Sequence, residues 1–216
     1  QFETGSLSQR LRALRAQAPR IFAIATERLA WQRGQNLFML FGALAGAREV
    51  LMIDAHGAVL RKTRSNLLLG GPARVSRDVV RSAATLAQAN RELVRLEREV
   101  LEQPATSFDK NRSTGVGPRM VYLRSTPGPG TQAGGAASHI RGVVEALIEL
   151  GAKVDVISND QIAGFDQSRI PLVVVEPESV GGTRAVFEIH NNLVFTRAAI
   201  PLVQDAQPDL IYQRYA

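Results

Sequence analysis

The sequence predicts an α/β fold for residues 119–216, with a parallel sheet that carries helices on both faces. Short apolar runs at 120–123, 154–157, 171–175 and 210–212 have the length and composition of buried strands. Between them lie stretches with helical spacing of apolar residues, at 140–150 and 187–203. Strands that alternate with helices are typical of a parallel sheet.

A glycine-rich loop is predicted to join the first strand of this sheet to the first helix. Residues 125–135 contain four glycines and two prolines. Glycine lets a ligand approach the backbone closely, and the start of the following helix offers unpaired N–H groups. We therefore expect the loop to accept an anion or a sugar hydroxyl at the carboxyl ends of the strands. Gly151 lies just beyond the last periodic residue, which predicts a left-handed helix stop there.

Composition limits the chemistry that the chain can perform. Of its 216 residues 45% are hydrophobic and none is cysteine, which excludes disulfides, thiolate metal sites and cysteine nucleophiles. No metal site is expected, and His56 is interpreted as a lone turn histidine without carboxylate or histidine neighbours at ligand spacing. No apolar run reaches the roughly 18 residues that cross a bilayer. We expect a cytoplasmic protein, and we interpret the sequence from Gln1 to Ala216 as an excised piece of a longer chain.

Residues 1–103 are predicted to form a separate, mainly helical region with one small β-hairpin. Helices are expected from Ser6 or Ser8, over 21–31, over 36–47 and from Ser76 to about Gln103. The hairpin joins strands at 50–54 and 59–63 through a turn at His56 and Gly57. Residues 104–118, which are rich in polar residues, proline and glycine, are interpreted as a linker between two folding units.

The positive charge is concentrated in this first region. Residues 1–103 carry 16 Lys and Arg against 9 Asp and Glu, whereas residues 104–216 carry 10 against 11. Plain solvated surface is one interpretation, and an anionic membrane surface, reached from the inner face of the membrane, is another. The candidates for membrane contact are Arg10, Arg12, Arg15, Arg61, Lys62 and Arg64. Nucleic-acid binding is not expected, because no recognised reader motif or aromatic interleaving accompanies the charge.

Several blocks of the second region together resemble a known family, the GT-B fold glycosyltransferases of family 4. The resemblance is to their amino-terminal, Rossmann-like domain. It rests on five blocks, which are Arg119–Leu123, the loop with Gly134 and Gly135, His139–Leu147, Leu150–Ser158 and Pro208–Tyr215. It covers residues 119–216 and leaves residues 1–103 without a recognised family.

This resemblance implies a retaining transfer of a sugar from a nucleotide sugar to a sugar or lipid-linked acceptor, of the kind used in cell-surface polysaccharide synthesis. It implies no cofactor and no obligate metal, since the nucleotide sugar is the donor substrate. The amino-terminal domain of such enzymes shapes the acceptor side, and the substrate-binding positions that match here are Gly134, Gly135, His139 and Arg214. No catalytic residue is assigned. The domain that holds the donor and its glutamate pair is not among these residues, so this part of the chain alone is expected to be inactive.

Two other functions stay open at this point. Gly128 and Gly130 could belong to a dinucleotide fingerprint of an oxidoreductase, with Asp160 as the ribose-binding acid, but Ala133 and the two prolines do not fit a G-x-G-x-x-G turn. A non-catalytic scaffold could use the helix at 76–103 and the basic surface. The candidate site residues also have plain interpretations, as an ordinary loop, a capping histidine and a surface arginine.

Overall fold

The computed structural model describes residues 6–17, 19–102, 117–126, 135–180 and 182–215. The chain divides into two compact units. The first unit contains residues 1–87 and 178–187, and the second contains residues 88–177 and 188–216. The predicted linker over 104–118 lies outside the described residues, apart from its last two, and it stays a prediction.

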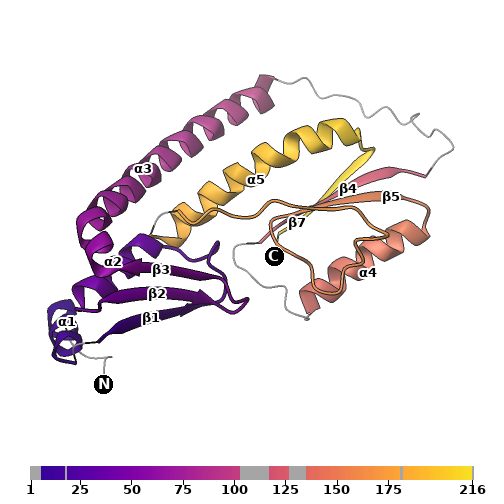
Figure 1. The fold of residues 1–216 in the computed structure, drawn as a ribbon. Coiled ribbons are helices and arrows are strands. Elements are labelled where there is room, and N and C mark those ends of the chain that lie inside the picture. The colour runs from indigo at the N-terminus through magenta and orange to yellow at the C-terminus, as the bar shows by residue number, and fades with distance from the viewer. Residues whose placement is uncertain (1–5, 18, 103–116, 127–134, 181, 216) are drawn as a thin grey trace. The chain divides into compact units, whose positions relative to one another are not determined.

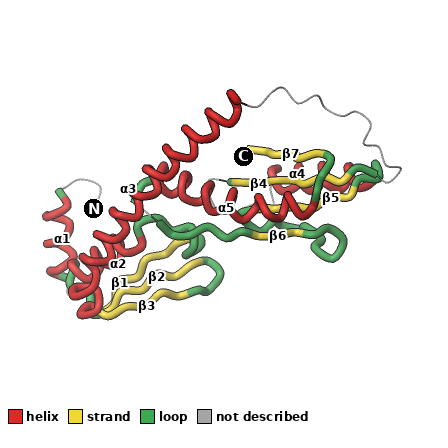
Figure 2. The backbone as a smooth tube through the Cα atoms, turned by 90° about the horizontal axis from the view of Figure 1, so that it is seen from above, coloured by secondary structure: helices red, strands yellow, loops and turns green. Residues whose placement is uncertain are grey.

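The first unit is built on a three-stranded mixed sheet. Its strands are β1 (Ile21–Thr26), β2 (Glu49–Asp54) and β3 (Val59–Thr63), in the order β1-β2-β3 (Figures 1 and 2). β1 runs parallel to β2, and β2 pairs antiparallel with β3. The predicted hairpin is confirmed, with Gly57 at a positive φ of 86° in its turn.

The first unit contains the helices α1 (Leu7–Ala16) and α2 (Gln35–Leu44) and the first part of α3 (Arg64–Glu102), which continues beyond Ala87 into the second unit. The first two confirm the predicted elements. Ser6 caps α1 through a capping box, in which its hydroxyl accepts from the Gln9 N–H and its own N–H donates to Gln9 Oε1 over 2.8 Å. The core lies between α2, the start of α3 and one face of the sheet, and its fully buried side chains include Met39, Val50 and Leu67.

Two expectations for this unit are wrong. The predicted helix over 21–31 is replaced in its first half by strand β1, which extends the hairpin to three strands, although helices still make up most of the described residues of this region. Phe22, Ile24 and Thr26 alternate with exposed residues, and a run this short satisfies both the helical and the strand period. Helix α3 begins at Arg64 instead of Ser76 and continues through Pro72. A proline inside a helix removes one N–H donor and crowds the carbonyl of the preceding turn. Here the neighbouring Gly71 is buried and packs closely against Leu40 of α2, which favours continuation of the helix.

The second unit contains the predicted parallel sheet. Its strands are β4 (Arg119–Ser125), β5 (Lys153–Ser158), β6 (Leu172–Val174) and β7 (Leu210–Tyr215), in the order β6-β5-β4-β7. All three pairings are parallel. Helix α4 (Gly135–Glu149) leads from β4 to β5, and α5 (Arg184–Ala206) leads into β7. The α/β class is therefore confirmed.

The two helices cover opposite faces of this sheet (Figure 1). Tyr122 of β4 is buried in a cluster with Ile140 of α4, whereas the neighbouring Val121 is buried in a second cluster with Phe195 of α5. This division follows from the alternation of side chains along a strand. Helix α5 is longer than the predicted 187–203 and includes Pro201. The predicted helix stop is confirmed, since Gly151 has a φ of 90°.

Two helical glycines should respond in opposite ways to replacement by alanine. A Cβ on Gly42 of α2 would lie 2.9 Å from atoms of Phe22 and Val50, so we expect Gly42→Ala to destabilise the first unit by about 1–3 kcal/mol through overpacking. A Cβ on Gly142 of α4 would meet nothing within 4 Å, so Gly142→Ala should stabilise the second unit by about 0.5–1 kcal/mol. Chemical denaturation measures both changes. A loss of stability in both variants would contradict the packing around α4.

Candidate functional site

The order of the strands marks one place in the second unit where a ligand is expected. From β4 the chain adds β5 and then β6 on one side, and it later adds β7 on the other side of β4. The connections from β4 therefore lead to one side of the sheet at first and to the other side later, and the change lies between β4 and β7. In open parallel sheets, ligands bind outside the carboxyl ends of the strands at such a switch point. In register, Arg124 and Ser125 of β4 lie opposite Arg214 and Tyr215 of β7.

The start of the glycine-rich loop is held at this edge by an asparagine. The Thr126 N–H donates to Asn159 Oδ1 over 3.0 Å, and Asn159 Nδ2 donates back to the Thr126 carbonyl over 2.9 Å. The backbone N–H of Asn159 also donates to the Arg124 carbonyl over 3.1 Å. Asn159 is almost fully buried. These three bonds fix the direction in which the chain leaves β4.

A second contact ties the end of β4 to the helix on the other face. Ser125 Oγ donates to Asn192 Oδ1 of α5 over 2.9 Å. Because successive residues of a strand face opposite sides, Ser125 faces α5 and Arg124 faces the side covered by α4. The carboxyl end of β4 is therefore held from both faces of the sheet.

The side of the sheet that α4 covers carries a buried polar network. Arg124 is only 4% exposed, and its Nη1 donates to Ser158 Oγ over 3.0 Å. Ser158 Oγ also accepts from the Asp160 N–H over 3.2 Å and donates to the Asp160 carbonyl over 2.7 Å. Burial lowers the pKa of the Arg124 guanidinium, and the negative charge of Asp160 opposes this shift. A cation is thus held in the interior directly beneath the switch point.

The predicted substrate-binding residues that the structure describes lie on different elements. Gly134 lies outside the described residues, and Gly135 is the first residue of α4. His139 lies one turn further along α4 and is exposed. Arg214 occupies β7 at the register position opposite Arg124. The fold therefore brings Arg214 and the origin of the glycine-rich loop onto neighbouring strands, while His139 lies on a different element.

Sequence reasoning missed Arg124 and Asn159 as parts of this site. A signal for Arg124 was present, because it follows Met120 and Tyr122 at intervals of two and so belongs to the same buried face. Asn159 carried no such signal, since it directly follows a strand and resembles any polar loop residue. Asp160, considered as a ribose-binding acid, is buried and accepts from the Gln161 N–H through Oδ1 over 2.9 Å.

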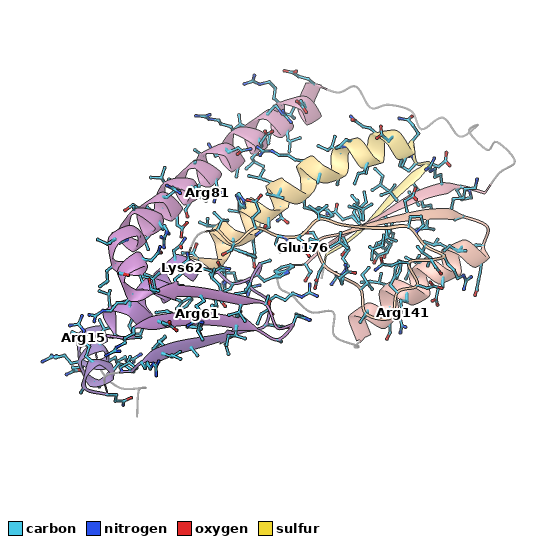
Figure 3. The ribbon with its side chains drawn as sticks, viewed as in Figure 1. Arg15, Arg61, Lys62, Arg81, Arg141 and Glu176 are labelled. Carbon is cyan, nitrogen blue, oxygen red and sulfur yellow. The ribbon has the colours of Figure 1, made fainter. Side chains whose placement is uncertain are left out.

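The candidates for membrane contact lie on several elements of the first unit, and Figure 3 labels Arg15 on α1 together with Arg61 and Lys62 on β3. Arg10, Arg12 and Arg15 are exposed, and Arg15 Nε donates to the Leu44 carbonyl over 2.7 Å. Arg61 pairs with Glu49 of β2. Lys62 follows on the other face and is half-buried, and both burial and the nearby Arg74 lower its pKa. Arg64 is the first residue of α3 and is exposed.

Three further findings bear on the class of protein. The described part of the chain brings no three histidine, aspartate or glutamate side chains together as a metal site. Among the described helices, none has the length and apolar character that crossing a bilayer requires. No family model, curated protein or solved structure matches the chain.

Proposed function

We propose that the chain is part of a retaining glycosyltransferase, which moves a sugar from a nucleotide sugar to a sugar or lipid-linked acceptor. In this proposal the second unit shapes the acceptor side of the cleft, and a further α/β domain holds the donor. One observation carries it. The strand order β6-β5-β4-β7 creates a switch point, and the end of β4, from which the glycine-rich loop departs, lies there in register with Arg214 of β7.

The chemistry of the site suits a donor with phosphates and an acceptor with hydroxyl groups. The first turn of α4 has N–H groups without a partner in the helix, and the helix dipole favours a negative charge at that end. Arg214 adds a permanent positive charge on the neighbouring strand, and guanidinium groups bind phosphate through paired N–H donors. The Asn159 and Asn192 contacts fix the end of β4, so that the backbone at this end needs little reorganisation when substrate binds.

The geometry gives less support to a nicotinamide-dependent oxidoreductase. A dinucleotide fingerprint needs a tight turn between strand and helix. Here β4 ends at Ser125 and α4 begins only at Gly135. Asp160 is buried and bonded within its own loop, which leaves it poorly placed to bind a ribose.

The test of this function uses the natural full-length protein. It is incubated with a panel of radiolabelled UDP-, GDP- and ADP-sugars and with sugar and polyprenyl-phosphate acceptors, and transfer is followed by chromatography. We expect transfer with at least one donor, and we expect Arg214→Gln to lower kcat/KM by about tenfold or more, since one charge-assisted contact is worth about 1.5–3 kcal/mol.

A matched control keeps the effect of the charge separate from a general effect of losing an arginine. Arg169 is exposed in the loop before β6, so Arg169→Gln should retain the activity of the unchanged protein. If no nucleotide sugar supports transfer, or if NADH oxidation appears in its place, the proposed function is wrong. If transfer occurs but Arg214→Gln has no effect, the function stands and the assignment of Arg214 does not.

A further inference from the structure

Two positively charged side chains of the first unit lie near each other without a negative partner. They are Lys62 of β3 and Arg74 of α3, and both are half-buried. Burial and the charge of the nearby Arg74 lower the pKa of Lys62. Among the described residues, no carboxylate forms an ion pair with either side chain. Because like charges repel each other, the fold spends stability to hold this pair together.

The register of β3 places Lys62 on the face of the sheet that the helices cover. Lys62 pairs with Val50, which is fully buried in the core together with Leu67 of α3. Paired residues of neighbouring antiparallel strands lie on the same face. The preceding Arg61 lies on the opposite face, where it pairs with Glu49 (Figure 3 labels Arg61 and Lys62). Lys62 is therefore on the side of α3, and Arg61 is not.

Helix α3 holds the Arg74 guanidinium against its own backbone. The side chain reaches back toward the start of the helix, as long helical side chains do, and its Nη2 donates to Asn66 Oδ1 over 2.7 Å. It crosses Gly70, where a Cβ would lie 2.8 Å from Nη2 and 3.3 Å from Cζ of Arg74. The absence of a side chain at Gly70 therefore leaves the space in which the guanidinium lies.

The guanidinium that is held in this way has a donor without an acceptor. Arg74 Nη1 is buried and has no hydrogen-bond partner in the described part of the chain. Removing a charged donor from water without giving it an acceptor is costly. The first turn of α3, which contains Asn66, has no acidic residue, and the helix dipole adds positive potential at this end. The surroundings of Arg74 and Lys62 therefore lack both an acceptor and a negative charge.

We propose that Lys62 and Arg74 form a binding site for a phosphate group. A guanidinium offers paired N–H donors to phosphate oxygens, and a lysine ammonium binds phosphate as a point charge. A phosphate dianion supplies the acceptors and the negative charge that the pair lacks. Both side chains are only half-buried, so an anion can approach them from solvent. The same group occurs in soluble phosphate compounds and in the headgroup of phosphatidic acid. The site is independent of sugar transfer.

Isothermal titration calorimetry with inorganic phosphate, at an ionic strength held constant with sodium chloride, tests the site. We expect the unchanged protein to bind phosphate. Lys62→Met keeps an aliphatic side chain of similar length and removes the charge, so it should lower the affinity by about tenfold or more. Arg61→Met is the matched control, because it removes a positive charge from the neighbouring residue on the opposite face, and it should bind as the unchanged protein does.

Gly70→Ala tests the geometry without changing any charge. Its Cβ would displace the Arg74 guanidinium from the position in which it bonds to Asn66, whereas alanine itself favours a helix more than glycine does. We expect phosphate binding to weaken by about threefold or more, the equivalent of one hydrogen bond. The fluorescence of Trp31 should show an undiminished denaturation midpoint for the first unit. Unchanged affinity in Gly70→Ala would remove Arg74 from the site and overturn the pairing.

Flotation with vesicles identifies the source of the phosphate group, and the vesicles contain phosphatidylcholine and phosphatidic acid in a ratio of about 4:1. Flotation that Lys62→Met abolishes and Arg61→Met retains assigns a lipid phosphate, whereas phosphate binding without flotation assigns a soluble compound. The proposal is overturned if neither probe binds the unchanged protein. It is also overturned if Lys62→Met binds both probes as well as Arg61→Met does, since binding would then reflect only the general positive charge of the surface.

Discussion

Replacing Ser158 with alanine should lower the free energy of unfolding of the parallel sheet by about 2–4 kcal/mol, a large effect for the loss of one oxygen atom. The Ser158 hydroxyl is fully buried and makes three hydrogen bonds, one with Arg124 and two with the backbone of Asp160. Without it, the Arg124 guanidinium loses an acceptor in a place that water reaches poorly. Losing a hydrogen bond to a buried charged group costs more than losing a bond between neutral groups.

Hydrogen exchange measures this prediction best, because it reports on β4 and β5 separately from the first unit. The amides of both strands should exchange faster in Ser158→Ala by the factor that corresponds to the lost free energy. Ser168→Ala is the matched control, since it removes the same atom from an exposed serine whose Oγ donates to Asp166 Oδ1 over 2.6 Å. Water replaces that bond, so the control should cost less than about 1 kcal/mol. Equal effects in both variants would show that burial of the network contributes nothing.

Local patterns were sufficient to predict the second unit. The apolar run of β4, the helical spacing of α4 and the left-handed stop at Gly151 each depend on residues close in sequence, and all three are confirmed. The alternation of strands and helices then predicts a parallel sheet, because a strand and its parallel neighbour need a crossover of this length. Arg214, by contrast, was singled out only by the resemblance to the glycosyltransferase family, and its register opposite Arg124 comes from the structure.

Features that depend on distant residues could not be predicted in this way. Strand β1 has a composition compatible with either helix or strand, and its identity is decided by pairing with β2, which lies more than twenty residues further along the chain. The burial of Arg124 depends on Ser158, and their separation of 34 residues hides the pair from any local pattern. The membership of residues 178–187 in the first unit also depends on contacts with the opposite end of the sequence.

The attachment of this late segment to the first unit leads to the second large effect, which we expect from Phe187→Ala. The Phe187 ring is 3% exposed and packs against Trp31, with 5.9 Å between the ring centroids. Ser179 Oγ, in the same segment, donates to the Gln32 carbonyl over 2.6 Å. Truncation of a buried phenylalanine typically costs about 3–5 kcal/mol. In this variant the first unit should therefore unfold at a much lower denaturant concentration, although residue 187 lies more than eighty residues beyond the 1–87 segment of that unit.

The chain supplies its own reporter for this experiment, because Trp31 is its single tryptophan. In Phe187→Ala the emission of Trp31 should shift to longer wavelength even in the folded protein, and its denaturation midpoint should fall. Phe195→Ala is the matched control, since Phe195 is equally buried, at 5%, but lies in the core between α5 and the parallel sheet. That variant should destabilise the second unit and leave the Trp31 transition in place. If instead Phe195→Ala moved the Trp31 midpoint as far as Phe187→Ala does, residues 178–187 would have no special role in the first unit, and the two cores would unfold together.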